Sequence, residues 1–133
     1  MRAAFIFPGQ GSQSIGMGKE IYENFSPASE LLQNASDSLK IDFENLLFNE
    51  NNLINRSEFT QPAIVLNSLM CYLALKQSVN LEPSFALGHA FLFIANYFLS
   101  SIQFFSLEFH HDSVLQILSV LVEESNTLQT YFL

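Results

Sequence analysis

The stretch "FALGHAFLF", residues 85–93, decides how we interpret the fold of this chain. Phe85 to Leu87 are an apolar run typical of a short strand, and Gly88-His89 then marks a turn. A second apolar run, Ala3 to Phe7, ends in the same way at Pro8-Gly9. A right-handed crossover is the usual way to return a chain to the same sheet. We therefore expect the two runs to be neighbouring parallel strands.

The segment between the two runs carries helical patterns, which predict an α/β layer. Ser26-Pro27 offers a capping serine and a first-turn proline for an amphipathic helix. Residues 43–59 predict a short helix followed by a connecting loop. Thr60 is a candidate N-cap, with Pro62 in the first turn of a helix that extends to about Gln77. This last helix is apolar nearly all round, so we expect it to be buried on every side.

Composition limits the classes of function. The chain has 133 residues, which is about one domain, and a formal net charge of -8. This acidic balance argues against a surface that neutralises nucleic-acid phosphates, so we expect no nucleic-acid partner. The only cysteine, Cys71, lies in an apolar run and is predicted to be a small buried hydrophobe. The apolar start of the chain is too short for a secretory signal, and we expect a cytoplasmic protein.

The loop "GQGSQSIGMG", residues 9–18, contains four of the five glycines of the chain. Glycines on either side of Gln10 would let the main chain approach a ligand closely. The alternative is a glycine-rich turn that only joins a strand to a helix. A nucleotide-binding loop is a weaker interpretation, because Ser14 stands where a dinucleotide motif needs its third glycine and Met17 where a phosphate loop needs lysine.

Three segments together resemble the N-terminal part of the malonyl-CoA:acyl carrier protein transacylases: "FIFPGQGSQSIGMGKEIY" (5–22), "FTQPAIVLNS" (59–68) and "FALGH" (85–89). The resemblance covers residues 1–89. It implies an α/β-hydrolase-like acyltransferase core with parallel strands and flanking helices. It also implies an S-malonyltransferase of fatty acid biosynthesis, which moves a malonyl group from coenzyme A to the carrier-protein thiol through a seryl ester. Malonyl-CoA and acyl carrier protein would be its ligands, with no further cofactor.

The resemblance also assigns roles to residues. The backbone amide of Gln10, flanked by Gly9 and Gly11, takes the place of the oxyanion donor, because a fixed N–H stabilises the negative charge that develops on a carbonyl oxygen. Gly88 and His89 match the start of the nucleophile elbow G-H-S-x-G.

The elbow is then lost. Ala90 stands where the nucleophilic serine belongs, and alanine has no atom that can form an acyl ester. Phe91 follows, and Leu92 replaces the small glycine. Other serines, Ser12, Ser84 and Ser100, have no elbow or base beside them in the sequence. No catalytic residue is therefore retained by this comparison, and we expect the chain to be inactive.

The family's other catalytic groups have no match downstream of the elbow. No arginine follows Arg56, whereas the family uses one to hold the malonyl carboxylate. His110 and His111 lie in a segment without resemblance. Adjacent helical residues point about 100° apart, so these two make a poor metal pair or proton relay. We expect no metal site.

Composition changes abruptly at position 90. Residues 90–133 contain no glycine, proline, lysine or arginine, and they hold seven of the 14 phenylalanines. Loss of the motif and change of composition at one point suggest one event, and we hypothesise that residues 90–133 are out-of-frame translation. On this interpretation residues 1–89 are the N-terminal part of a truncated acyltransferase domain. Its α/β core would be incomplete, with a helical, unassigned C-terminal third.

Three classes of function stay open on these observations. The first is an acyltransferase and the second is a non-catalytic remnant or binding module. The third is a membrane-associated protein, because residues 85–107 are 23 residues without a formal charge, long enough to span a bilayer. His89, Asn96 and Gln103 interrupt that stretch, and no lysine or arginine flanks it, which argues against the third class.

Overall fold

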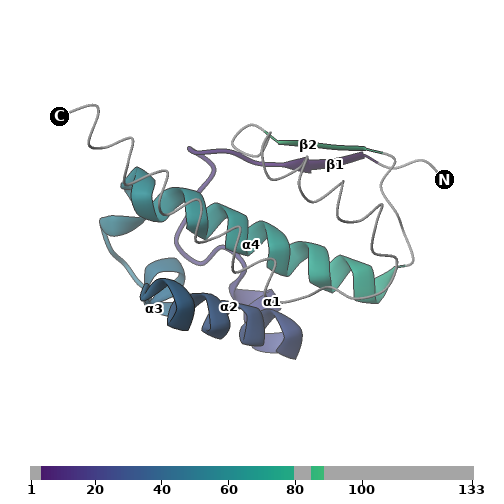
Figure 1. Cartoon of the computed structure of the whole chain (residues 1–133), viewed down its shortest axis with the longest axis horizontal. Helices are drawn as coiled ribbons and strands as arrows, with labels where there is room; N and C mark the ends of the chain where they lie inside the picture. Colours follow the sequence, from purple (N-terminus) through teal and green to yellow (C-terminus); the bar gives the residue numbers. More distant parts are fainter. Residues whose placement is uncertain (1–3, 80–84, 89–133) are drawn as a thin grey trace.

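The computed structural model describes residues 4–79 and 85–88 (Figure 1). Its elements follow one another as strand, helices, strand. In chain order they are β1 (Ala4–Phe7), α1 (Lys19–Asn24), α2 (Ser26–Leu39), α3 (Phe43–Phe48), the short 3-10 helix η1 (Leu53–Asn55), α4 (Ser57–Ser78) and β2 (Phe85–Gly88). This order confirms the α/β arrangement predicted for this part of the chain.

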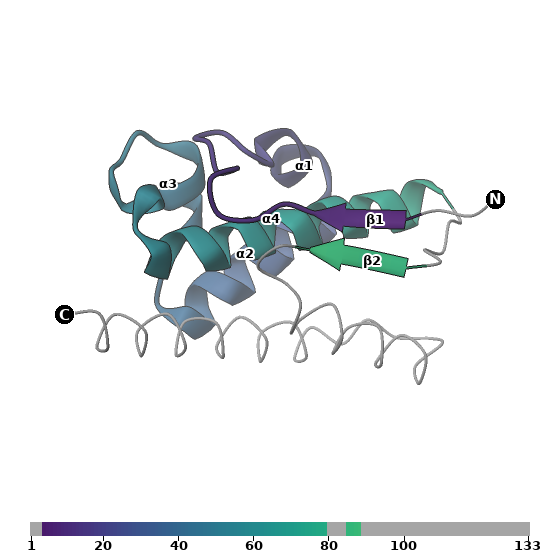
Figure 2. The same ribbon diagram turned by 90° about the horizontal axis from the view of Figure 1, so that it is seen from above.

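The two strands form a parallel pair, as the sequence predicts. Ala4 lies opposite Phe85, and Phe7 lies opposite Gly88. Both arrows point the same way in Figure 2. The carboxyl ends of β1 and β2 therefore meet at one edge of the sheet, and this edge is where the Gln10 loop begins.

Helix α4 is the central element of the fold. Figure 1 shows it between the two strands and a layer formed by α1, α2 and α3. On the strand side, the ring of Phe5 packs edge-on against Tyr72 of α4, with 5.8 Å between the centroids. On the other side lies the main hydrophobic core. Its buried members are Ala28, Leu31, Leu32 and Ala35 of α2, Phe43, Leu46 and Leu47 of α3, Ile54 of η1, and Ala63, Val65, Leu66, Leu69 and Met70 of α4.

The predicted start of α4 is wrong. The helix begins at Ser57 after an Arg56 N-cap, so Thr60 and Pro62 lie inside it. Thr60 is buried, and its hydroxyl bonds to the carbonyl oxygens of Ile54 (2.5 Å) and Arg56 (2.9 Å). Because the Thr60 hydroxyl donates to carbonyl groups earlier in the chain, it ties α4 to η1 and does not cap the helix.

The other helices agree better with the sequence. Helix α2 begins at Ser26 with a proline in its first turn, although its N-cap is Phe25 and no side chain caps it. The short helix predicted after it is α3, followed by η1. Helix α1 was not predicted. It has only six residues and none is buried, so it carries no strong periodic signal.

The burial predicted for α4 and Cys71 is only partly correct. Ten residues of α4 are buried, but Cys71 is exposed, and Leu75 is 39% exposed. The last buried residue of α4 is Tyr72, and residues 75–78 are exposed, so the end of the helix is less covered than the periodic pattern alone suggests. Cys71 is therefore not the buried hydrophobe that the sequence predicts.

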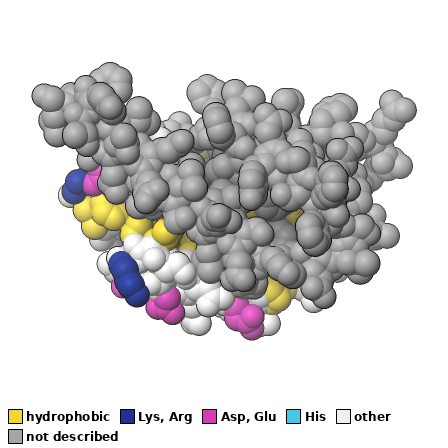
Figure 3. Space-filling view, in the orientation of Figure 1, with side chains coloured by type: hydrophobic (Ala, Val, Ile, Leu, Met, Phe, Trp, Pro, Cys, Tyr) yellow, Lys and Arg dark blue, Asp and Glu magenta, His cyan; other side chains and the backbone are white. Residues whose placement is uncertain are grey.

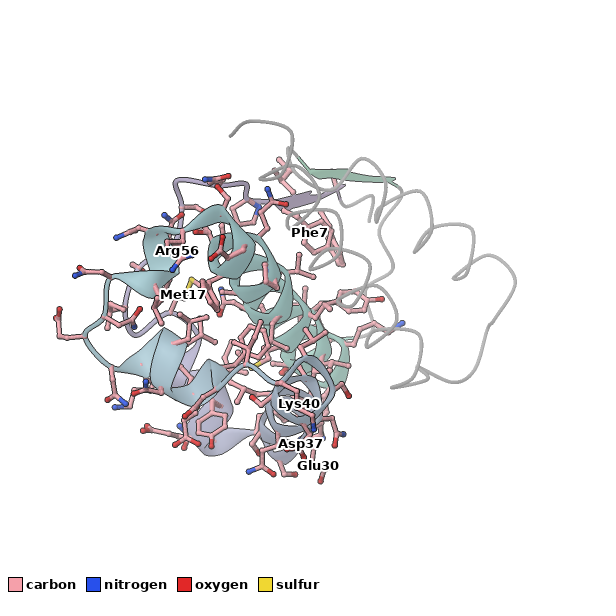
Figure 4. All side chains as sticks on the ribbon, turned by 60° about the vertical axis from the view of Figure 1, so that its left-hand side comes forward. Phe7, Met17, Glu30, Asp37, Lys40 and Arg56 are labelled. Atoms are coloured by element: carbon pink, nitrogen blue, oxygen red, sulfur yellow. The ribbon has the colours of Figure 1, made fainter. Side chains whose placement is uncertain are left out.

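Charged side chains lie on the outer side of the helical layer. Figure 3 shows acidic and basic groups scattered along the described lower edge of the molecule. Figure 4 places Glu30, Asp37 and Lys40 at the outer surface of α2, and all three are exposed. This is the usual distribution for an amphipathic helix that covers a core.

Two sequence predictions fall outside the described residues. They are the helical character of residues 90–133 and the membrane interpretation of residues 85–107, of which only β2 is described. Within residues 4–79 and 85–88, no helix combines the length and apolar character needed to cross a membrane.

Candidate functional site

The glycine-rich loop after β1 forms a tight turn at the carboxyl edge of the sheet. The carbonyl of Gly9 accepts hydrogen bonds from the backbone N–H of Ser12 (3.2 Å) and from its hydroxyl (2.7 Å). Gly11 has φ +104°, a backbone conformation that L side chains rarely adopt, while the space where a Cβ would lie is open. Glycine is thus required at position 11 by conformation and not by lack of room.

Two glutamine side chains attach this turn to the start of α4. The Nε2 of Gln10 donates to the Oγ of Ser57 (2.9 Å), and the Nε2 of Gln13 donates to the Oδ1 of Asn55 (3.2 Å). Gln13 also accepts the backbone N–H of Gly11 at its Oε1 (2.8 Å). The loop is therefore held from the side of η1 and α4 as well as by its own turn.

The backbone N–H of Gln10 has no hydrogen-bond partner within the part of the chain that the structure describes. It lies in an exposed loop between two anchored side chains. A fixed N–H of this kind can donate to a developing negative charge on a ligand oxygen. This geometry is compatible with the oxyanion role that the family resemblance assigns to Gln10.

The fold places both halves of the predicted site at one edge. Gly9, Gln10 and Gly11 follow β1, and Gly88 ends β2 opposite Phe7. His89 and Ala90 come next in the sequence but lie outside the described residues. The parallel register thus starts the Gln10 loop and the elbow remnant side by side.

Asn55 and Ser57 were missed by the sequence analysis. They contact the loop across 42 and 47 residues, and no local motif connects them with it. A second close approach was also missed: a Cβ at Gly18 would lie 2.2 Å from the Oδ1 of Asn67 on α4. That buried oxygen has no hydrogen-bond partner within the described part of the protein.

Arg56 is the basic residue closest in sequence to Ser57, and its charge is already engaged. Its guanidinium forms an ion pair with Glu58 and lies 5.6 Å from the centroid of the Phe59 ring. In the described ranges, no group of three or more His, Cys, Asp or Glu side chains could hold a metal ion.

Comparison with known proteins decides the relationship. No family model matches the chain. A malonyl CoA-acyl carrier protein transacylase from Bacillus subtilis is 39% identical over 88 residues, which are 65% of this chain and 22% of that protein. This chain is related to the malonyl-CoA:acyl carrier protein transacylases. The matched length is close to the 89 residues from which the sequence resemblance was drawn.

Solved transacylase structures share the fold. The malonyl-CoA:acyl carrier protein transacylase of Helicobacter pylori aligns with a TM-score of 0.72 and 42% identity, over 89% of this chain and 37% of that one. A malonyl-transacylase solved in complex with a type II polyketide acyl carrier protein aligns with a TM-score of 0.62 and 30% identity, over 67% of this chain and 29% of that one. The chain therefore has an α/β acyltransferase fold, and it spans less than a quarter of the B. subtilis transacylase.

Proposed function

We propose that this chain carries the oxyanion side of a malonyl-CoA:acyl carrier protein transacylase site and does not perform covalent acyl transfer. The observation that carries the proposal is Ala90, which follows Gly88-His89 where the family's elbow has its serine. A methyl group has no lone pair with which to attack a thioester carbonyl, so no acyl-enzyme ester can form there.

The geometry of the described edge supports this assignment. Gly88 pairs with Phe7, so the elbow remnant and the Gln10 loop begin on adjacent strands. The Gln10 N–H is a donor without a partner among the described residues, which suits a ligand oxygen. The donor half of the site is thus present, while the nucleophile position holds alanine.

The ligand class follows from the relatives. Their names specify a malonyl thioester of coenzyme A and an acyl carrier protein, and one solved relative is a complex with such a carrier protein. We propose that this chain binds the malonyl thioester weakly through the Gln10 loop, as a non-catalytic binding module. An active S-malonyltransferase of fatty acid biosynthesis is the competing function, and Ala90 argues against it.

A transfer assay separates these two functions. The purified chain is incubated with malonyl-CoA and a carrier protein that bears its phosphopantetheine thiol, and malonylated carrier is measured by mass. We expect no product above the rate without the chain. Ala90→Ser alone should not restore transfer, because Phe91 and Leu92 still replace the residues of the elbow. Turnover by either protein would contradict the proposal, and circular dichroism verifies that each is folded.

We also propose that residues 90–133 are out-of-frame translation, which would make the α/β core incomplete. The support is the absence of glycine, proline, lysine and arginine from this segment, directly after the motif is lost. Translating the nucleotide sequence beyond codon 89 in the other two frames tests this. An S-x-G continuation in one of them is the expected result, and its absence from both would refute the hypothesis.

A further inference from the structure

We propose that Asn55 and Ser57 are positioning residues, which hold the loop of the Gln10 backbone N–H against η1 and α4 through the side-chain amides of Gln13 and Gln10. The inference rests on the proposed function, because it assigns these residues to the same ligand-binding loop. Neither residue belongs to the segments on which the family resemblance was based.

Residue 10 is held at its side chain and at the peptide that follows it. On one side, the Gln10 side chain donates to Ser57 Oγ (2.9 Å). On the other side, the next backbone N–H, that of Gly11, donates to Gln13 Oε1 (2.8 Å). The N–H of Gln10 itself lies in the Gly9–Gln10 peptide plane, whose carbonyl accepts from the backbone N–H and the hydroxyl of Ser12. The bonds to Ser57 and Gln13 hold residue 10 beyond this plane, and so they tie the loop that carries the N–H to η1 and α4.

Asn55 determines which end of the Gln13 amide faces Gly11. An amide has one accepting oxygen and one donating nitrogen. The Oδ1 of Asn55 accepts from Gln13 Nε2 (3.2 Å), which turns Oε1 toward the loop backbone. An acceptor at position 55 is therefore needed to present an acceptor to Gly11.

The anchors are not part of the core. Asn55 is exposed and Ser57 is half-buried, and both hydrogen bonds lie at exposed positions. Neither residue is among the core residues that pack α2 against α4. We therefore expect substitutions here to loosen the loop while the global stability of the protein changes little.

Amide hydrogen exchange of the full chain tests the proposal. In Asn55→Ala and Ser57→Ala, exchange of the Gly11 N–H, which donates to Gln13 Oε1, should accelerate roughly three- to tenfold, the range expected for loss of one hydrogen bond. Asn55→Asp and Ser57→Thr keep an oxygen at each position and should restore most of the protection. Ser78→Ala, a serine of the same helix whose hydroxyl bonds only to Ala74 O, is the matched control and should leave the loop unchanged.

The same variants are then titrated with malonyl-CoA. We expect Asn55→Ala and Ser57→Ala to weaken binding several-fold at an unchanged melting temperature, and Ser78→Ala to bind like the parent chain. Unchanged loop exchange in both alanine variants would refute the positioning role. Faster exchange throughout the protein would refute the positioning role too, since it would show that Asn55 and Ser57 stabilise the whole fold and not the loop in particular. If the parent chain does not bind malonyl-CoA, the proposed function fails, while the exchange data still decide whether the anchors hold the loop.

Discussion

Gly18 is the residue whose replacement is expected to disturb the packing most directly. It begins α1 with φ +77°, and a Cβ there would meet Asn67 Oδ1 at 2.2 Å. Gly16 also has a positive φ, +90°, but a Cβ there would meet nothing within 4 Å. Replacing each glycine by alanine therefore separates the cost of the left-handed backbone, which both positions share, from the cost of steric overlap, which only Gly18 has.

Gly18→Ala should lower the free energy of unfolding by more than about 2 kcal/mol, because it adds a clash to the cost of a left-handed alanine. Gly16→Ala should cost only about 1 to 2 kcal/mol, the conformational part alone. Denaturant titration of both variants measures the difference. Equal losses would show that the contact between Gly18 and Asn67 is not tight.

The hydrogen bond of the Tyr22 hydroxyl should make the free energy of unfolding depend on pH. This hydroxyl donates to Glu44 Oε2 (2.9 Å), and this bond, then desolvation and then the Glu44 charge, raise the pKa of Tyr22 above 10.0. The folded state thus favours the protonated phenol. The bond contributes its full stability below the unfolded pKa and loses it as the pH rises through the raised folded pKa.

Tyr22→Phe removes this dependence. The difference in unfolding free energy between the parent chain and the variant should be constant from about pH 7 to pH 9 and should shrink above about pH 10. Denaturant titrations across this range provide the measurement. A difference that grows with alkalinity would mean that Glu44 does not act as the acceptor.

At the scale of elements, α4 organises the molecule, and its two halves should respond differently to truncation. Leu66 is completely buried, whereas Leu75 is 39% exposed on the same helix. Leu66→Ala should cost about 2 to 5 kcal/mol, from lost burial and a residual cavity. Leu75→Ala should change the unfolding free energy by less than about 0.5 kcal/mol. Thermal unfolding of this matched pair tests whether the core lies on the α2–α3 side of α4.

The elements differ in how far the sequence predicts them. Parallel β1 and β2 follow from two short apolar runs that end in glycine turns, since a right-handed crossover is the usual way to return a chain to the same sheet. Their burial does not follow in the same way, because no residue of β1 is buried and Ile6 is 77% exposed. The start of α4 could not be predicted in this way, because threonine is a common N-cap residue and Thr60 stands just before an apolar run. Only the bond from its hydroxyl to Ile54 O shows that Thr60 lies inside the helix and contacts η1. Cys71 is exposed although its neighbours Met70 and Tyr72 are buried, and an apolar run along one helix does not show which of its positions other elements cover.

The arrangement of the candidate site could be predicted in part for the same physical reason, while the roles of its residues stay predictions. Gln10 and Gly88 are found by local motifs, and the parallel register then brings their segments to one edge. The anchors at Asn55 and Ser57 are tertiary contacts between side chains that are distant in sequence, so no local pattern specifies them. Motifs therefore identified the loop, while only the fold identified what holds it.

At the scale of the whole molecule, the chain combines an acyltransferase fold with an alanine at the position of the family's nucleophile. The relationship over 65% of the chain supports the first part, and Ala90 in the sequence supports the second. In related catalytic sites, removing the nucleophile leaves only the small acceleration that binding and oxyanion donors supply. We therefore expect the chain to bind malonyl-CoA without being acylated by it.

The most direct test is the intact mass of the protein after incubation with isotopically labelled malonyl-CoA and denaturation, which removes ligand that is not covalently bound. The account predicts a single species at the mass of the unmodified chain, and the same result for Ala90→Ser. A stoichiometric malonyl increment on the parent chain would contradict the account, because it would show that another residue acts as the nucleophile.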